Sequence, residues 1–410
     1  MKTVRLLAFT AALGVSLAAA RGAAQTILYK FGGSPDGATP EGLVAGPKSV
    51  LYGTTAYGGT SGYGTVFQLA PPAKGGAAWI ETVLYRFTNQ NGDGANPFAS
   101  VTVGPKGEIY GTTAAGGSNG LGTVYELQPP AVSGGTWTET VLYSVDGDED
   151  NGFGLYRGVV VGPHGELYGV FSSGGSGGNG IVFELSPPAT AGAAWTFSVL
   201  YTFSDGGDGH TPVGLTIGSD GVLYGTTSYG GSSGAGTVFA LTAPAAEGGW
   251  TETVLYNFTG LDDGAAPLQP PVLASGAIYG TASGGGSIGS GTVFELTPPA
   301  VQGGTWTYTV IYNLGHGDGE LPDSPLTVHN GTVYGTTATG SGAGNTGGTV
   351  FELQPPTEPG GSWTETVLHN FTGQIGPYGS LFVDKSGALF GATSRGPGAN
   401  GAGFVYRIKP

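Results

Sequence analysis

The chain has 410 residues, no cysteine, and a formal charge of −15 at pH 7 from 13 Lys and Arg against 28 Asp and Glu. An acidic surface repels phosphate, so this balance argues against nucleic acid and anionic lipid as partners, and the lack of cysteine excludes disulfides. Glycine accounts for 83 residues, but there is no triplet period and short apolar runs alternate with the glycine-rich patches, which excludes collagen and disorder.

The N-terminus has the features of a secretory signal peptide, which we place at residues 1–24. Lys2 and Arg5 precede the uncharged run Leu6–Ala20, and this run is too short to span a bilayer. A buried first helix is the alternative, but no helical pattern appears elsewhere. Loss of Lys2, Arg5 and Arg21 takes the formal charge from −15 to −18. No later hydrophobic run reaches membrane length, so we expect an exported, soluble protein, extracellular or periplasmic, with no membrane insertion.

The stretch Leu51 to Leu69 returns in close copies down the whole chain. Its aromatic residue recurs every 55 to 58 residues, at Tyr52, Tyr110, Tyr168, Tyr224, Tyr279, Tyr334 and Phe390. A fixed period of this length is typical of solenoids, propellers and arrays.

Each repeat contains four runs of strand character. In the fourth repeat they are residues 196–203, 214–218, 222–227 and 236–241, all rich in aromatic and β-branched residues. Four strands in a unit of about 56 residues, repeated radially, describe a propeller blade.

The two ends of the chain indicate a closed ring. The outer run of a seventh unit is missing after Gly403 to Pro410, and it is found instead at Ile27 to Phe31. We therefore predict that the N-terminal strand completes the last blade, which removes the free sheet edges. The predicted fold is all-β: one seven-bladed β-propeller of four-stranded blades over residues 25–410.

Two regular features are better explained by packing than by ligand binding. Each repeated aromatic residue is followed by glycine, and we expect that this lets an aromatic side chain of the adjacent blade pack on bare backbone. The six tryptophans fall one per unit before the outer run. They could stack on sugars, but we favour a place in the core or at blade junctions.

An Asp-Gly pair recurs after the outer run, with proline four residues beyond the aspartate. In a propeller this link leads to the next inner strand, on the face that carries the glycine-rich loops. A ring of carboxylates there could bind a cation or a polar ligand, whereas the alternative is an Asx-turn that shapes the link. The aspartates are Asp36, Asp93, Asp208, Asp263 and Asp318, of which the last four are candidate ligand-rim residues.

The third repeat departs from this pattern. Its link is an acidic loop in which Asp146, Asp148 and Asp150 alternate at a spacing that suits calcium, although the glycine is one place late for an EF-hand loop. The same repeat carries Tyr156 and Arg157, and it places Phe171 where other repeats have threonine. We take Asp148, Asp150, Tyr156, Arg157 and Phe171 as candidate ligand-rim residues, and calcium as the one cofactor to consider.

The unit LYGTT-x-GG-x-G-x-GTVFEL-x-PP, followed by W-x-ETVLY-x-F, resembles the GloVer tandem repeat of exported bacterial proteins with varied surface anchors. The resemblance covers essentially all of residues 25–410. It implies secretion or surface exposure and a propeller-like fold, and it carries no functional residues over.

No catalytic constellation stands out from the sequence. The five histidines lie at unrelated places in their repeats, and the inner runs are nearly uncharged. We therefore expect an exported, monomeric, non-enzymatic binding or structural protein that presents a polar loop face to a glycan or protein partner. The alternative is a carbohydrate-active enzyme, a lyase or hydrolase, that uses Asp148 or Asp150 with Arg157 on the same face.

Overall fold

The computed structural model describes residues 23–73, 78–132, 134–148, 151–190, 192–204, 206–245, 248–301, 303–315, 317–340, 347–358, 360–373, 375–396 and 401–410. The predicted signal peptide lies outside the described residues except for Ala23 and Ala24. Across the described ranges the only helix is the three-residue turn η1 (Pro47–Ser49), so none of them holds a helix that could cross a membrane.

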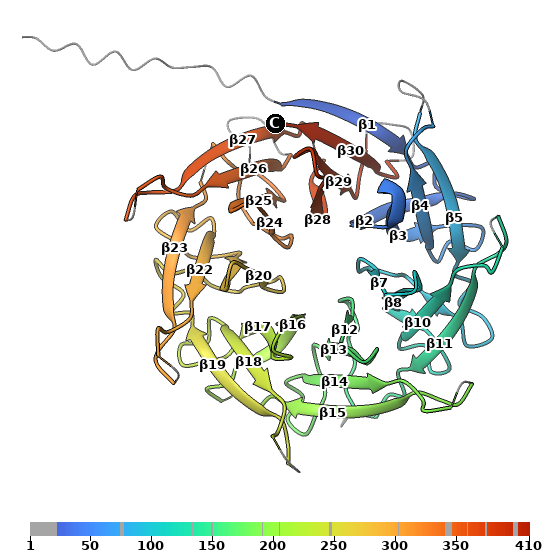
Figure 1. Cartoon of the computed structure of the whole chain (residues 1–410), viewed down its shortest axis with the longest axis horizontal. Coiled ribbons are helices and arrows are strands. Elements are labelled where there is room, and N and C mark those ends of the chain that lie inside the picture. Colours follow the sequence, from blue (N-terminus) through green and yellow to red (C-terminus); the bar gives the residue numbers. More distant parts are fainter. Residues whose placement is uncertain are drawn as a thin grey trace, which may run out of the picture.

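Seven four-stranded antiparallel sheets stand around a central axis (Figure 1), which confirms the predicted propeller. The innermost strands are β2 (Gly37–Ala45), β7 (Thr102–Val103), β12 (Val160–Val161), β16 (His210–Ile217), β20 (Val272–Ala274), β24 (Thr327–His329) and β28 (Pro377–Val383). The second strands are β3 (Leu51–Gly58), β8 (Ile109–Thr113), β13 (Leu167–Phe171), β17 (Leu223–Tyr229), β21 (Ala277–Ala282), β25 (Thr332–Thr337) and β29 (Leu389–Thr393).

Outside them lie the third and fourth strands of each blade. The third strands are β4 (Thr65–Ala70), β10 (Thr123–Gln128), β14 (Ile181–Ser186), β18 (Thr237–Thr242), β22 (Thr292–Thr297), β26 (Thr349–Gln354) and β30 (Phe404–Lys409). The outermost strands are β5 (Ile80–Arg86), β11 (Thr138–Ser144), β15 (Thr196–Thr202), β19 (Thr251–Asn257), β23 (Thr307–Asn313), β27 (Thr364–Asn370) and β1 (Ala24–Lys30).

The ring is closed by the two ends of the chain. Strand β1 pairs antiparallel with β30, from Ala24 opposite Lys409 to Lys30 opposite Phe404, and the two strands lie side by side in Figure 1. The last blade therefore has the order β1-β30-β29-β28. This confirms that the N-terminal strand supplies the seventh outer strand.

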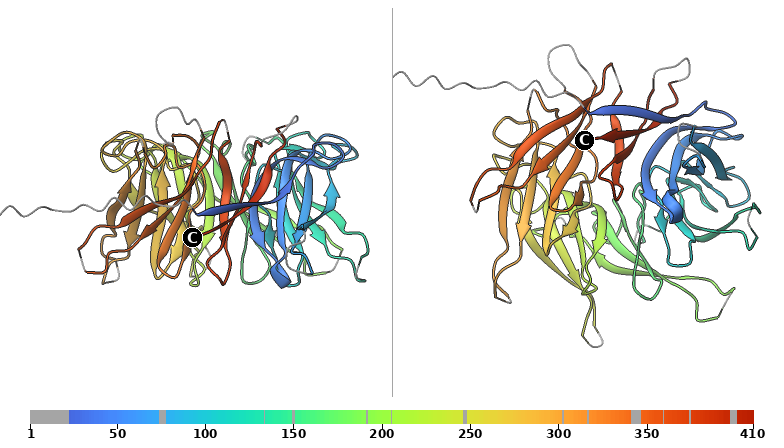
Figure 2. Two further views of the ribbon diagram at one scale, coloured as in Figure 1. Left: turned by 90° about the horizontal axis from the view of Figure 1, so that it is seen from above. Right: turned by 45° about the horizontal axis from the view of Figure 1, so that its top comes forward.

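The glycine-rich loops and the Asp-Gly links lie on the same face of the ring. In the second blade the short strands β6 (Gly94–Ala95) and β9 (Ala115–Gly116) pair directly, and the amide of Gly117 donates to the carbonyl of Asp93 at 2.8 Å. Figure 2 shows the blades from the side, with loops gathered at both ends of the strands. We call the end with the glycine-rich loops the loop face.

The glycine after each repeated aromatic residue makes room for a ring, but from the same blade. Gly53 is paired with Phe67 of β4, and a side chain at Gly53 would collide with that ring. The same cross-strand arrangement recurs in the other six blades, over Tyr125, Phe183, Phe239, Phe294, Phe351 and Tyr406. The expectation of a partner from the adjacent blade was therefore wrong, because directly opposed residues on one sheet face lie closer than residues of neighbouring blades.

The tryptophans lie at the blade junctions, as expected. Trp137 of the second blade packs edge-on against Tyr52 of the first, with ring centroids 6.2 Å apart. Equivalent contacts follow around the ring, and Trp79 against Phe390 joins the first blade to the last at 5.8 Å. Each tryptophan therefore forms one aromatic contact between its own blade and the preceding one.

Four outer strands carry a glutamate that is packed inward. Within the described residues, one carboxylate oxygen of each is buried without a hydrogen-bond partner, in Glu81, Glu139, Glu252 and Glu365. Burial, together with the charge of the aspartate in the nearby link, raises the pKa of each of these carboxyls to about 7. In the third blade Phe197 takes this position and stacks on Tyr143 at 4.5 Å, so the fold also accepts an uncharged ring there.

These glutamates predict that the protein is more stable in mild acid than at alkaline pH. Their folded pKa of about 7 lies above the ordinary value of 4.5, so their contribution is complete below about pH 4.5 and is lost as the pH rises through about 7. With solvent screening we expect on the order of 1 kcal/mol from each.

The measurement is the melting temperature from about pH 5 to about pH 8. The fourfold Glu→Gln variant at residues 81, 139, 252 and 365 should flatten the decline, whereas Glu358→Gln, at an exposed position, should leave it unchanged. An equally steep decline in the fourfold variant would contradict this origin.

Candidate functional site

The site includes a position at which the repeats carry residues of very different chemistry. After the link, six blades have a proline, and the third blade has Leu155 at that position. The residues that follow the six prolines are all different, and the third blade has a tyrosine there, as the last blade does. Each proline ring packs against a glycine of the preceding blade, the one that comes just before the third strand. Gly236, for example, packs against Pro267. The seven variable residues are Glu41, Phe98, Tyr156, Val213, Leu268, Asp323 and Tyr378, and we call them the variable ring.

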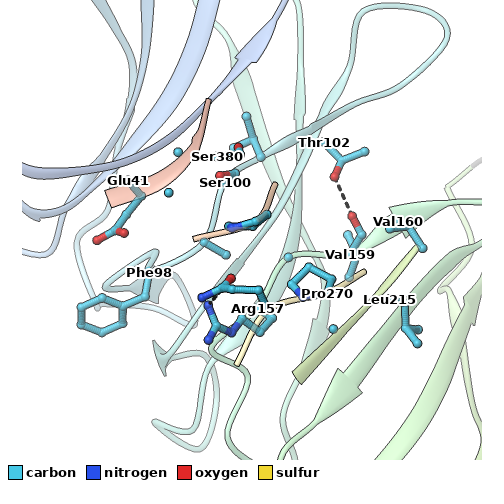
Figure 3. Close-up of a pocket in the computed structure, with 18 of the residues that line it drawn as sticks. Glu41, Phe98, Ser100, Thr102, Arg157, Val159, Val160, Leu215, Pro270 and Ser380 are labelled. Carbon is cyan, nitrogen blue, oxygen red and sulfur yellow. Dashed lines mark hydrogen bonds between the residues drawn. The ribbon is translucent and has the colours of Figure 1, made fainter. Parts of the chain in front are cut away.

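Four residues of the variable ring, Glu41, Phe98, Asp323 and Tyr378, line a central cavity of about 220 Å³ to which all seven blades contribute. Glu41 reaches it from β2, Tyr378 from β28, and Phe98 from the segment between β6 and β7. Figure 3 shows Glu41, Phe98 and Arg157 around this cavity. Seven blades thus bring side chains from across the whole sequence to one point.

Arg157 connects three blades across the axis. Its Nη2 donates to the carbonyl of Leu268 at 2.7 Å, and its Nη1 to Oε1 of Gln269 at 3.4 Å. Gln269 in turn donates from Nε2 to the Asp323 carbonyl at 2.9 Å and to the Asp323 carboxylate at 3.0 Å. The backbone of Arg157 is fixed as well, because Thr112 Oγ1 donates to its carbonyl at 3.0 Å. These contacts fix the position of the guanidinium.

The two acids of the cavity are poorly solvated. Glu41 is only 2% exposed, and burial raises its pKa to about 8 although the charge of Arg157 opposes the change. Burial likewise raises the pKa of Asp323, against the hydrogen bond from Gln269 and the charge of Arg157. At neutral pH the Glu41 carboxyl is therefore largely protonated, so it can both donate and accept hydrogen bonds.

The predicted residues of the third repeat separate in the structure. Arg157 lines the cavity, and Tyr156 belongs to the variable ring with 55% of its surface exposed. Phe171 is wholly buried and packs on Phe183 at 4.9 Å. The structure therefore corrects the assignment of Phe171 to the rim: it replaces a threonine whose counterparts pair inside the blade, and Ile181 replaces the partner threonine.

The side chains of the predicted aspartates accept hydrogen bonds from residues at the start of their own links or at the end of the preceding strand. Asp208 accepts from the Tyr201 hydroxyl at 3.0 Å and from the Ser204 amide at 2.9 Å, and Asp263 accepts in the same way from Tyr256 and Thr259. Burial alone would raise the pKa of Asp208 and Asp263, but these hydrogen bonds hold it below the ordinary value. Asp93 accepts from the amide and hydroxyl of Thr88, and Asp318 from the Gly315 amide. None of the four lines the central cavity.

The acidic loop of the third repeat is also separate from Arg157. Asp146 accepts from the Asp148 amide at 3.0 Å and from the Asn151 side chain at 2.9 Å, and neither Asp146 nor Asp148 lines the central cavity. Asp150 lies outside the described residues. Among those described, no group of three or more His, Asp or Glu side chains is arranged to hold a metal ion, so calcium at Asp146, Asp148 and Asp150 stays a prediction.

Sequence reasoning missed five residues on which the site depends: Glu41, Phe98, Gln269, Asp323 and Tyr378. Four of them occupy the position after the proline, and Gln269 follows Leu268, which occupies that position in the fifth blade. The sequence did offer one signal, because acidic, aromatic and aliphatic residues all occur at this position in different repeats.

Comparison with known proteins gives a family. The pattern of the Gloeobacter/Verrucomicrobia repeat matches residues 14–239 and 211–410. No curated protein matches the chain.

Among solved structures, the chain is similar to a putative gluconolactonase (14% identity, TM-score 0.43, covering 95% of this chain and 92% of the other). It is also similar to a putative 6-phosphogluconolactonase from Bacteroides uniformis (14% identity, TM-score 0.49, 80% and 84%) and to an ulvan lyase of a polysaccharide lyase family (10% identity, TM-score 0.47, 94% and 96%). Likeness at this level carries no inference about activity.

Proposed function

We propose a function for this chain, which belongs to the Gloeobacter/Verrucomicrobia repeat family. It is an exported, monomeric, non-enzymatic protein that binds a glycan in the central cavity of its loop face. The observation that carries the proposal is the Arg157–Gln269–Asp323 chain of hydrogen bonds beside Glu41 in a cavity with aromatic walls.

A sugar offers hydroxyl groups that need both donors and acceptors, together with apolar ring faces. The cavity meets both needs: Arg157 donates, Asp323 accepts and the largely protonated Glu41 does both, while Phe98 and Tyr378 present ring surfaces. Because Arg157 is already held by Leu268 and Gln269, little side-chain entropy is lost when a ligand binds.

A glycan array followed by titration calorimetry tests the proposal. We expect Arg157→Ala to weaken binding by about tenfold or more, because a charge-assisted donor at the centre of the site is lost. Arg86→Ala is the matched control, since Arg86 is exposed on the outer strand β5, where its Nε donates to the Pro35 carbonyl at 3.3 Å. Arg157→Lys, which keeps the charge, should give an intermediate affinity.

Melting curves of all variants show whether the fold is intact. Unchanged affinity in a folded Arg157→Ala protein contradicts the proposed site. A screen that finds a protein partner and no glycan contradicts the proposed ligand.

One observation favours a second candidate, a carbohydrate-active lyase or hydrolase. Glu41 is a buried acid with a pKa near neutrality beside a cation, which is typical of acid–base catalysts. If the array yields a bound polysaccharide, its incubation with the protein should be followed for new reducing or unsaturated ends. Turnover that is abolished by Glu41→Gln would support the enzyme, and no turnover with intact binding would support the binding protein. The version that uses Asp148 has less support, since Asp148 does not line the cavity.

A further inference from the structure

We infer that the ligand is an anionic oligosaccharide, carrying carboxylate or sulfate groups, which runs from the central cavity outward across the first and seventh blades to Arg395. This inference rests on the proposed function and names the class of ligand and its path. Three independent features of the loop face lead to it.

The first feature is a second hollow that continues the first. It has a volume of about 530 Å³ and shares Glu41, Phe98 and Tyr378 with the central cavity. From these shared residues it extends over Thr39 of the first blade to Ser394 and Arg395 after β29 of the last. The two hollows together form an elongated space that leads from the central cavity to the segment after β29, which suits a chain better than a single sugar.

The second feature is the row of aromatic side chains along this space. Tyr57 and Phe98 pack edge to face, with ring centroids 5.7 Å apart, on one side. Tyr378 lines both hollows on the other side and is 39% exposed, while Tyr57 is 47% exposed. Exposed rings held by packing offer apolar surface for sugar faces at low cost in conformational entropy.

The third feature is the placement of the arginines. Residues 25–410 contain four, Arg86, Arg157, Arg395 and Arg407, in a segment with a formal charge of −18. Arg157 lines the inner hollow and Arg395 the outer one, and no lysine lines either. Of the two acids present, Glu41 is largely protonated at neutral pH. An acidic protein that places half of its arginines along one groove has the charge distribution expected for an anionic ligand.

The test compares short oligogalacturonates with the same oligomers after reduction of their carboxyl groups, alongside sulfated oligosaccharides of neutral backbone. We expect the acidic oligomers to bind about tenfold or more tightly than the reduced ones, with an affinity that falls as salt increases. The sulfated arm shows whether carboxylate or sulfate is the preferred anion.

The variants locate the chain on the loop face. Arg395→Ala should weaken binding of acidic oligomers about tenfold while leaving binding of the acidic monosaccharide unchanged, whereas Arg157→Ala should weaken both. Arg395 and the control Arg86 are both exposed, so neither alanine variant is expected to disturb folding.

The possible failures are distinguishable. If reduced and acidic oligomers bind equally, or if Arg395→Ala behaves like Arg86→Ala, the inference is wrong and the proposed glycan site survives. If neither acidic nor neutral glycans bind the intact protein, the proposed function fails and the inference fails with it.

Discussion

A chain that starts at Gly32, and so lacks β1, is expected to lose most of its stability and to aggregate at room temperature. The deletion removes the only partner of β30 on its outer side and takes away Leu28 and Phe31, which are 8% and 6% exposed. Phe31 packs on Phe67 of the first blade, with ring centroids 5.0 Å apart. Loss of these two side chains alone costs roughly 5–10 kcal/mol, which is comparable with the whole stability of a typical domain.

The control for this deletion is a chain that starts at Ala23, which keeps β1. A sharper test is a circular permutant in which residues 24–31 follow Pro410 through a short turn, since Ala24 lies opposite Lys409 in the antiparallel pair. The permutant should recover the melting temperature and the monomeric state of the control, because it restores the same strand and closes the exposed edge. A truncated chain that melts within a few degrees of the control would show that ring closure contributes little.

The fold could be predicted because the same strand and turn pattern occurs in seven copies along the chain. The displaced run at Ile27 to Phe31 was enough to place the N-terminal strand in the last blade. Single contacts were harder to assign. A glycine such as Gly53 signals that a ring needs space, but whether the ring comes from β4 or from another blade depends on register and blade spacing, which short-range patterns do not contain.

The candidate site was less accessible from the sequence for a physical reason. Arg157 stood out because its repeat breaks the common pattern. By contrast, Gln269 meets Arg157 across 112 residues of sequence and Asp323 meets Gln269 across 54, and both contacts form only when the ring closes. The recurrence of Asp208 and Asp263 left open either a rim of carboxylates or a turn that shapes the link. Their hydrogen bonds to Tyr201 and Tyr256 favour the turn.

We expect Gly225→Ala to destabilise the fourth blade by about 3 kcal/mol, at the upper end of the range for overpacking. A methyl group there would approach Phe239 to within 2.3 Å, and Phe239 is fully buried and packs on Phe203 at 5.2 Å. The ring cannot move aside without displacing its neighbours. Gly207→Ala is the control, in the link that leads into the same blade, because a methyl group at Gly207 meets nothing within 4 Å.

A double-mutant cycle with Phe239→Leu identifies the cause of this loss. Phe239→Leu alone should destabilise the protein by leaving a cavity, but in combination with Gly225→Ala the smaller side chain frees the space that the methyl group needs. The double variant should therefore be more stable than the sum of the two single effects predicts, by about 1 kcal/mol or more in chemical denaturation. Strict additivity would mean that the Phe239 ring does not cause the loss. The methyl group would then be excluded by nearby backbone, for instance by the Gly214 carbonyl.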